Sequence, residues 1–536
     1  MMQPWYWRSL PLKNRTGAQI FAALFASDTI ATLLESPYPS PPDRLPQARY
    51  SICAGKPRII NDRLQMWTPA VGEVLSCLRQ RLLSAANWLV IPPYPTLPFT
   101  GGWLGWLGYD LAWEIEKLPT LKQDLLPFPV AFWYEPECFA VLDHWEQVLY
   151  LATSDPQQLD QLEHHLVESP SAHASLTPLL STGGTPAREW LLNGGHLRTK
   201  KAAPLPLCPR QFDATSLNGG NPRTRVAPQR RTPPHEKSGS SAPLPPCPPS
   251  PPPLFLTSQT EYENAVWRAK KYIQAGDIFQ ANLSLRFETE TTASGWEIYQ
   301  TLHKINPSPF ASYWRSPWGE IASCSPERLV QLVGQQATTR PIAGTRSRGT
   351  TPERDRQLAQ ELRSNTKERA EHIMLVDLER NDLGRVCNWG SVVVDELLTI
   401  ERYSHVMHLV SNIKGTLNAN YSPIDLIQAM FPGGTITGCP KVRCLEIIEE
   451  LELVRRNLFY GSCGYLDWRG NIDLNILIRT LLLAPTPSTA TPVTQKVWGQ
   501  VGAGIVADSD PEKEWHESLY KAQAQLTALN ETRDEG

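Results

Sequence analysis

Two periodicities of apolar residues run through the chain, and they predict strands and helices close together. Residues 278–287, IFQANLSLRF, alternate strictly, with aromatic and aliphatic side chains on one face. The other face carries Gln280, Asn282, Ser284 and Arg286, because the side chains of a strand point alternately to its two sides. Such a strand buries its apolar face, and its polar face lines a cleft or meets solvent.

Helices are marked by their ends as well as by apolar spacing. Ser258 begins an S-x-x-E capping pattern, apolar residues follow at helical spacing, and Gly276 fits the end of that helix. A second capping pattern, from Ser509 to Glu512, predicts the start of the last helix. A helix that ends at Gly276 therefore precedes the alternating strand.

A proline-rich segment divides the chain. Between residues 170 and 253 there are 18 prolines, ten lysines or arginines and three acidic residues. Proline lacks the N–H that a strand ladder needs, and the segment shows no periodicity, so we interpret residues 169–254 as a basic, flexible insertion. It separates an amino-terminal region, 1–168, from a carboxy-terminal region, 255–530.

Composition excludes several classes of function. The chain is 41% hydrophobic and 20% charged, which is enough apolar sequence for a sizeable core. A net charge of −3 argues against a nucleic-acid binder that depends on bulk positive charge. There is no apolar run near the ~20 residues of a membrane span, no secretory signal and no CxxC pair, which predicts a cytoplasmic protein without a zinc site.

Three glycine-containing loops in the carboxy-terminal region are suited to binding anions. They are RPIAGTRSRG at 340–349, FPGGTITGCPKVR at 431–443 and VGAGIVADS at 501–509. Backbone N–H groups in such loops, and at the start of a helix, attract negative charge. Plain turns are the alternative for any one loop. Three together suggest a substrate with more than one carboxylate.

Carboxylates on two predicted helices suggest a magnesium site. Glu371 lies in KERAEHIMLVDLERND, and Glu514 and Glu517 are three residues apart in the last helix, so that they point the same way. Mg²⁺ prefers such hard oxygen ligands and completes its shell with water and substrate oxygens. A charged, solvated helix face is the alternative interpretation.

The longer motifs resemble those of the chorismate-utilising enzymes, which include anthranilate synthase component I, aminodeoxychorismate synthase component I, and the isochorismate and salicylate synthases. The motifs are PIAGTRSRG, AEHIMLVDLERNDLGRV, YSHVMHLVSNIKG, FPGGTITGCPKVRCLEIIEELE, YGSCGYLDWRGNIDLNILIRT and VGAGIVADSDPEKEWHES, in the family's order. The resemblance implies an α+β, anthranilate synthase component I-like fold, with antiparallel sheets packed between helical layers and a central cleft.

The resemblance also implies roles for individual residues. The chorismate-binding positions that it implies are Gly344, Thr345, Tyr460, Arg479, Gly502, Ala503 and Gly504. It implies a catalytic histidine at His408, a glutamate for proton transfer at Glu327, and a lysine after the glycine loop at Lys441. The implied magnesium ligands are Glu371 and Glu517, with Glu514 beside them.

Gln280 separates amination from hydration within this family. The isochorismate and salicylate synthases resemble one another in having lysine at this position, where it can act as a general base for water. A neutral amide cannot do so, and it therefore favours ammonia, which is already a nucleophile. A non-catalytic tryptophan-sensing or scaffold subunit is disfavoured, because every matched substrate and metal position is filled.

Two aminations remain: attack at C2, which gives anthranilate, and net replacement at C4, which gives 4-amino-4-deoxychorismate. Ala343 resembles anthranilate synthases, since many aminodeoxychorismate synthases have a nucleophilic lysine there. FPGGTITGCPK, IFQANLSLRF and AFWYEPECFAVLDH resemble the aminodeoxychorismate group instead. On this balance the sequence favours aminodeoxychorismate synthase component I, with anthranilate synthase component I as the alternative.

Two further partners follow from the sequence. The nearest match to a glutaminase nucleophile motif, GSCGY around Cys463, lacks the final glycine, so we expect a separate glutamine amidotransferase subunit to supply ammonia. ATLLESPYP resembles the family's tryptophan-contacting element. This likeness implies an L-tryptophan pocket with Ser36 on one side and Pro309 and Phe310 on the other; a helix end before a proline-rich turn is the alternative.

Overall fold

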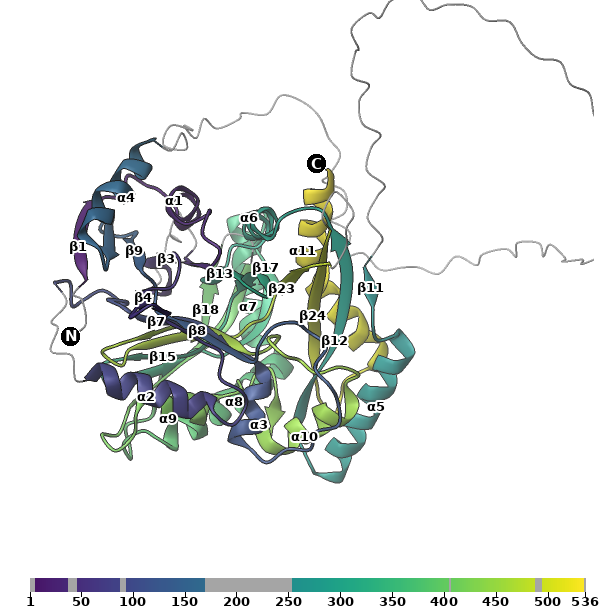
Figure 1. The fold of residues 1–536 in the computed structure, drawn as a ribbon. Coiled ribbons are helices and arrows are strands. Elements are labelled where there is room, and N and C mark those ends of the chain that lie inside the picture. The colour runs from purple at the N-terminus through teal and green to yellow at the C-terminus, as the bar shows by residue number, and fades with distance from the viewer. Residues whose placement is uncertain are drawn as a thin grey trace, which may run out of the picture. The chain divides into compact units, whose positions relative to one another are not determined.

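The computed structural model describes residues 5–36, 46–86, 93–168, 253–403, 406–486 and 494–534, which belong to one compact unit (Figure 1). The proline-rich insertion predicted at 169–254 therefore lies outside the described residues except at its last two positions. No helix in this described part of the chain is long and apolar enough to cross a membrane.

The first of two large sheets has twelve strands, and all of its pairings are antiparallel. Their order is β1-β10-β9-β3-β2-β13-β14-β23-β24-β12-β11, with β20 beside β12. Their bounds are β1 Tyr6–Pro11, β2 Ala31–Glu35, β3 Tyr50–Ala54, β9 Cys138–Asp143, β10 Val148–Thr153, β11 Leu254–Phe255, β12 Gln280–Thr291, β13 Phe310–Ser316, β14 Gly319–Ser325, β20 Gly438–Cys439, β23 Thr480–Pro485 and β24 Gln495–Ile505.

The second sheet has ten strands and is also antiparallel. Their order is β17-β19-β16-β15-β22-β21-β7-β8-β6, and β18 pairs with β19. Their bounds are β6 Met66–Trp67, β7 Gly102–Leu107, β8 Ala131–Tyr134, β15 Arg328–Val333, β16 Gln336–Thr339, β17 Ile342–Ser347, β18 Val393–Arg402, β19 Val406–Thr416, β21 Ser462–Asp467 and β22 Ile472–Asn475. A small hairpin joins β4 Ile59–Ile60 to β5 Arg63–Leu64.

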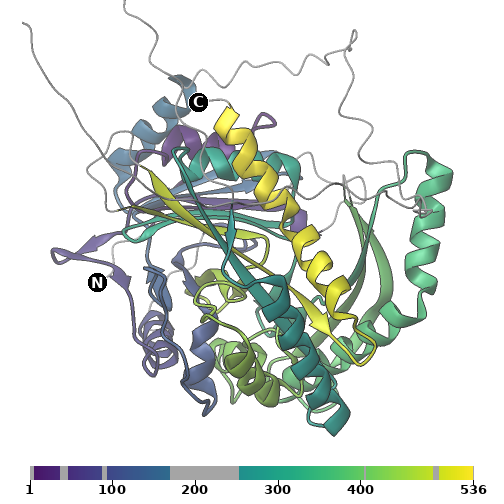
Figure 2. The ribbon, with the colours of Figure 1, turned by 90° about the vertical axis from the view of Figure 1, so that its right-hand side faces the viewer.

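Helices cover the two sheets (Figures 1 and 2). Their bounds are α1 Gly17–Leu24, α2 Val74–Ala86, α3 Ala112–Ile115, α4 Pro156–Glu168, α5 Gln259–Ala275, α6 Gly295–Ile305, α7 Pro352–Ser364, α8 Thr366–Gly384, α9 Pro423–Met430, α10 Lys441–Leu451 and α11 Pro511–Asp534, with short 3₁₀ turns at Pro46–Ala48 and Tyr109–Leu111. Helices α1, α4, α5, α6, α10 and α11 pack on the twelve-stranded sheet, and α7, α8 and α9 contact the ten-stranded sheet.

Two large hydrophobic cores hold these layers together. One joins the twelve-stranded sheet to the six helices that pack on it. The other draws side chains from both sheets, and the rings of Trp106 and Trp314 meet edge to face across them, with centroids 5.9 Å apart. Such aromatic pairs add to the stabilisation that burial itself provides. The predicted arrangement, antiparallel sheets between helical layers, is confirmed.

Both regions of the chain contribute strands to both sheets. In the twelve-stranded sheet, β2 of the amino-terminal region pairs with β13 of the carboxy-terminal region. In the ten-stranded sheet, β7 pairs with β21. The two regions therefore share one architecture and one central core.

The ends of two helices test the predicted caps. The Ser258 side chain accepts a hydrogen bond from the backbone N–H of Glu261, and Gly276 closes α5 in the left-handed conformation, as predicted. The predicted cap at Ser509 is wrong. Helix α11 begins at Pro511, and the Asp510 carboxylate accepts from the N–H of Lys513 at 3.1 Å. A proline at the first helical position gives the cap to the residue directly before it.

Strand β12 places its polar face inside the protein. Its apolar side chains enter the core, as the alternation predicts, although Phe279 precedes the strand and is exposed. Of the polar side chains, Gln280, Ser284 and Arg286 are buried, and Asn282 is half-buried. The alternative of a solvated polar face is therefore wrong, because other segments cover it.

Candidate active site

Strands β17 and β19 bring Thr345 and His408 together. The Thr345 hydroxyl and Nδ1 of His408 are hydrogen-bonded at 2.9 Å, and a bulge interrupts the pairing between Ala343 and Thr345. Gly344, inside that bulge, has φ = 67°, which glycine adopts without strain. Burial, and then the positive charge of Arg479, lowers the pKa of His408 to about 3. The imidazole is therefore neutral at physiological pH.

Arg479 is a half-buried cation, and within the described ranges no ion pair joins it to a carboxylate. Its Nη1 donates to Asn306 Oδ1 at 3.4 Å. Burial lowers its pKa, while nearby groups that include Glu327 act in the opposite direction. A guanidinium binds a carboxylate through two parallel hydrogen bonds, so this side chain is suited to an anionic ligand.

Glu327 is a buried acid close to this cation. It follows β14, and its backbone is held by the N–H of Ile476, which donates to the Glu327 carbonyl at 3.0 Å. Burial raises the pKa of its carboxyl to about 7 despite the charge of Arg479. A carboxyl with this pKa carries a proton part of the time at neutral pH, which suits a general acid.

Two of the three predicted glycine loops are largely strands: residues 340–349 contain β17, and residues 501–505 of the third form the end of β24, which lies along β12. Gly502 pairs with Ser284 and Gly504 with Asn282, where β24 runs beside β12. A side chain at Gly504 would collide with Nε2 of Gln280, so glycine lets this buried amide lie against the strand. Ala503 points into the core and offers only backbone groups to a ligand.

The arginine of a buried ion pair packs against the ring of Tyr460. The guanidinium of Arg456 lies 4.6 Å from the centre of the Tyr460 ring. It pairs with Glu452 at 2.6 Å and donates to the carbonyl of Asn282 at 2.7 Å. Tyr460 itself is buried, with φ = 65°. These bonds fix β12 against the segment that carries Tyr460.

The ammonium group of Lys441 is already bound within the protein. Its Nζ donates to Asp382 Oδ2 at 2.6 Å and to the carbonyl of Met430 at 3.1 Å. This ion pair joins the start of α10 to α8. Lys441 thus acts on this loop through Asp382 rather than as a free amine.

The three predicted metal ligands differ in their surroundings. Glu371 on α8 is half-buried, Glu514 on α11 is buried, and the Glu517 side chain is 54% exposed and pairs with Lys521 at 2.9 Å. In the part of the chain that the structure describes, no three acidic, histidine or cysteine side chains form a metal cluster. Magnesium needs only one or two carboxylates when water and substrate supply the other ligands, so the donor chemistry of Glu371 and Glu514 fits.

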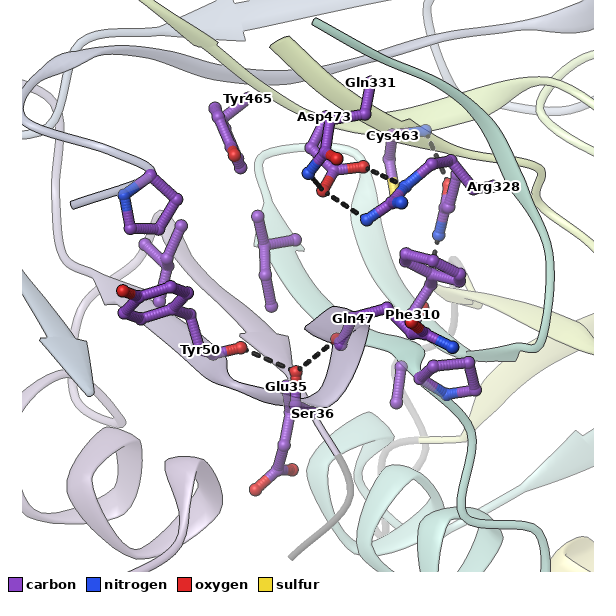
Figure 3. Close-up of a pocket in the computed structure, with 17 residues that line it drawn as sticks. Glu35, Ser36, Gln47, Tyr50, Phe310, Arg328, Gln331, Cys463, Tyr465 and Asp473 are labelled. Carbon is purple, nitrogen blue, oxygen red and sulfur yellow. Dashed lines mark hydrogen bonds and ion pairs between the residues drawn. The ribbon is translucent and has the colours of Figure 1, made fainter. Parts of the chain in front are cut away.

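A cavity of about 110 Å³ lies where strands of both sheets meet, and Figure 3 shows its walls. Ser36, Pro309 and Phe310, the three predicted tryptophan-pocket residues, all line it. The Ser36 hydroxyl donates to the carbonyl of Tyr50 at 2.6 Å. A cavity of this size exceeds the roughly 10–15 Å³ that one water needs, so it can accept a small organic molecule.

The opposite wall of this cavity carries a charged pair. Arg328 donates to both oxygens of Asp473, at 2.8 and 2.9 Å, and its guanidinium stacks over the Phe310 ring at 4.9 Å (Figure 3). The cavity therefore combines an aromatic wall with fixed polar groups, as small-molecule sites usually do.

Sequence reasoning missed two members of the candidate active site, Asn306 and Glu379. Asn306 contacts Arg479 from the end of α6; it begins the NPSPFA motif at 306–311, which the sequence assigns to the tryptophan pocket and not to the active site. Glu379 lies one helical turn before Asp382 on α8, in the motif that contains Glu371, so helical spacing could have found it.

The fold agrees with comparisons to known proteins. The family model for chorismate binding enzymes matches residues 216–527. The chain is 53% identical to the anthranilate synthase component I-like protein of Synechocystis over 98% of its own length and 92% of that protein's. Together these matches place the chain among the chorismate-binding enzymes.

Individual relatives carry different names. Aminodeoxychorismate synthase component 1 of Bacillus subtilis is 39% identical over 82% of this chain and 78% of that protein. Anthranilate synthase component 1 of Synechocystis is 50% identical over 51% of this chain and 54% of that protein. The crystal structure of anthranilate synthase component I from Streptococcus pneumoniae superposes with a TM-score of 0.64 at 27% identity, covering 92% of this chain and 95% of that one. The chain is thus a chorismate-converting enzyme of the anthranilate synthase component I type.

Proposed function

We propose that the chain is aminodeoxychorismate synthase component I, which converts chorismate and ammonia to 4-amino-4-deoxychorismate on the route to p-aminobenzoate and folate. The observation that carries the proposal is the environment of Arg479, a half-buried cation without an ion-pair partner in the described residues, near the acid Glu327 and the neutral His408. A dianionic substrate would neutralise this charge.

Arg479, Glu327 and Gln280 have separate roles in the proposed amination. Arg479 binds a substrate carboxylate through two hydrogen bonds, and the N–H groups of the 501–509 loop add weaker donors. Glu327 gives its proton to the hydroxyl that leaves from C4, so that it departs as water. Gln280 presents an amide, which cannot deprotonate water but leaves ammonia free to attack.

Magnesium would be held by Glu371 on α8 and by Glu514 or Glu517 on α11. Its charge would neutralise the ring carboxylate and help the hydroxyl to leave. The ion pair with Lys521 makes Glu517 the weaker donor of the two on α11, because Lys521 would have to move away first.

Two observations favour amination at C4. The FPGGTITGCPK loop resembles the aminodeoxychorismate group. In addition, Synechocystis has one protein named anthranilate synthase component 1 and another named anthranilate synthase component I-like, and this chain matches the second over nearly its whole length. We infer that the chain corresponds to the enzyme that is distinct from anthranilate synthase.

Anthranilate synthase component I is the second candidate, and Ala343 favours it. This residue lies beside Gly344 on β17, opposite Leu409 of the strand that carries His408. An alanine cannot form the covalent adduct that a lysine would form there. If the product is 4-amino-4-deoxychorismate, ammonia must therefore be used directly.

Product analysis tests both the amination and the source of nitrogen. With chorismate, Mg²⁺ and an ammonium salt, we expect a product that becomes p-aminobenzoate only after aminodeoxychorismate lyase is added. Fluorescent anthranilate formed without the lyase would instead identify the second candidate. With glutamine replacing ammonium, the isolated chain should be inactive, because a separate amidotransferase subunit supplies ammonia in our proposal. Turnover of glutamine by the chain alone would remove that subunit from the proposal.

L-tryptophan is the proposed ligand of the cavity in Figure 3. The Phe310 ring offers an apolar surface for an indole, and Ser36 and Arg328 lie at the polar walls. Isothermal calorimetry should detect binding to the wild type, and Phe310→Ala should weaken it about tenfold or more, since losing a buried aromatic contact costs ~1.5–3 kcal/mol. Absence of heat from the wild type at saturating ligand would remove the claim.

A further inference from the structure

Glu379 is a buried carboxyl group on α8, in the motif that also contains Glu371. The side chain is 4% exposed, and its Oε2 accepts a hydrogen bond from the Thr339 hydroxyl at 3.1 Å. The loop at Gly434 passes close to its other oxygen, and a side chain at Gly434 would collide with Leu378. Glycine at this position therefore lets the 431–443 loop pack directly onto the helix that carries Glu379.

Three charged or titratable groups surround this carboxyl. Asp382 is one turn further along α8, and Lys441 reaches it from the start of α10. Glu327 lies two residues before Leu329, whose carbonyl accepts from the same Thr339 hydroxyl at 2.9 Å. Burial, followed by the charge of Asp382, raises the pKa of Glu379 to about 8, and Lys441 opposes this rise. The carboxyl is therefore mostly protonated at neutral pH.

A carboxyl group at a buried helix position lowers the stability of the fold. An apolar residue would fill the space without a proton or an unsatisfied oxygen, and a buried carboxyl is stable only while it keeps its proton. Enzymes retain groups of this kind where a proton has to be held and passed on. Among the described residues no lysine or arginine forms an ion pair with Glu379, since Lys441 bonds to Asp382.

We propose that Glu379 returns a proton to Glu327 after each turnover, and thereby reloads the general acid of the reaction. The inference rests on the proposed role of Glu327. In the amination, the nitrogen lone pair forms the new C–N bond, the C4–O bond breaks, and the hydroxyl leaves as water with the proton of Glu327. The new ammonium group of the product then loses one proton. Glu379 takes up that proton after it has passed its own to Glu327. Both carboxyl groups are then protonated again, so no external acid is consumed.

Single-turnover and steady-state kinetics of Glu379→Gln separate reloading from other roles. At pH 6 to 6.5 the enzyme starts with Glu327 protonated, so the first turnover, measured by rapid quench with excess enzyme, should match the wild type. The steady-state kcat should fall about tenfold or more. Glu379→Asp keeps a group that carries a proton, and it should recover most of kcat. Asp377→Asn, at a 76%-exposed position on the same helix, is the matched control and should change neither rate.

Each alternative result has a distinct meaning. Equal losses in the first and later turnovers would make Glu379 a structural residue, and unchanged kcat would exclude it; either result overturns the relay. Glu327→Gln should already abolish the first turnover. If that variant is active, the assignment of the acid in the proposed function fails, whatever Glu379 does.

The stability of Glu379→Gln gives a second readout. The folded pKa of Glu379 lies above its ordinary value of 4.5, so the folded chain binds a proton that the unfolded chain releases. Because the folded chain must keep this proton while protons become scarcer, the free energy of unfolding falls as the pH rises from about 4.5 to about 8. The glutamine variant lacks that cost, and its melting temperature should exceed that of the wild type at pH 8 but not at pH 4. A structural glutamate would give the opposite sign.

Discussion

Replacement of Arg479 by methionine is expected to abolish most chorismate turnover without destabilising the protein. Two charge-assisted hydrogen bonds to a carboxylate are worth ~3–6 kcal/mol, so kcat/KM should fall about 10²- to 10⁴-fold. Stability should stay equal or rise slightly, because the variant removes a half-buried charge that has no ion-pair partner in the described residues. Steady-state kinetics and thermal melting of the same preparation measure both effects.

Arg456 provides the matched control for this variant. It is more deeply buried than Arg479, and it pairs with Glu452 and donates to two backbone carbonyls. Arg456→Met should therefore cost about 3–5 kcal/mol of stability, because it leaves a buried carboxylate unpaired. An Arg479→Met enzyme with an unchanged KM, or one that melts as low as Arg456→Met, would contradict the assignment of Arg479 to the substrate carboxylate.

Replacement of Glu371 by glutamine should abolish magnesium-dependent activity and leave the fold intact. The amide keeps the shape and the helix propensity of glutamate, but it removes the negative charge that a divalent cation needs. Calorimetric titration of Mg²⁺ into the enzyme with chorismate bound should show at least tenfold weaker binding. This measurement does not depend on turnover.

Glu353→Gln is the control for the metal variant. Glu353 lies on α7, is mostly exposed and pairs with Arg356, so its loss should change neither binding nor activity. Full activity of Glu371→Gln at limiting Mg²⁺ would exclude Glu371 as a ligand. The same titration of Glu514→Gln and Glu517→Gln decides which carboxylate of α11 takes part.

Local patterns in the sequence were sufficient for much of the fold. The alternation of residues 278–287 predicts β12, and the capping pattern at Ser258 with the glycine at 276 predicts both ends of α5. These signals succeed because they depend on backbone hydrogen bonds within a few residues. The family motifs added the sheet arrangement, which local periodicity alone does not encode.

The errors and omissions concern contacts between distant segments. The burial of the polar face of β12 depends on Glu452 and Arg456, more than 160 residues away, which bond to it. The ion pair of Lys441 likewise depends on a distant residue, Asp382, and nothing in the loop motif indicates this partner. The cap at Ser509 failed for a local reason, since two adjacent residues both suited the position and Pro511 selected the second.

The pairing of β2 with β13 has a consequence for how the protein is made. Glu35 ends β2, and Phe310 begins β13 about 275 residues later in the chain. At roughly 5–20 residues per second, a ribosome needs on the order of 15–55 s to make that length. Throughout that interval β2 of the nascent amino-terminal region has an unpaired edge, and the later residues that complete the shared core have not yet been made. We expect chaperones to hold it in this state, and a slow translation rate to increase its aggregation.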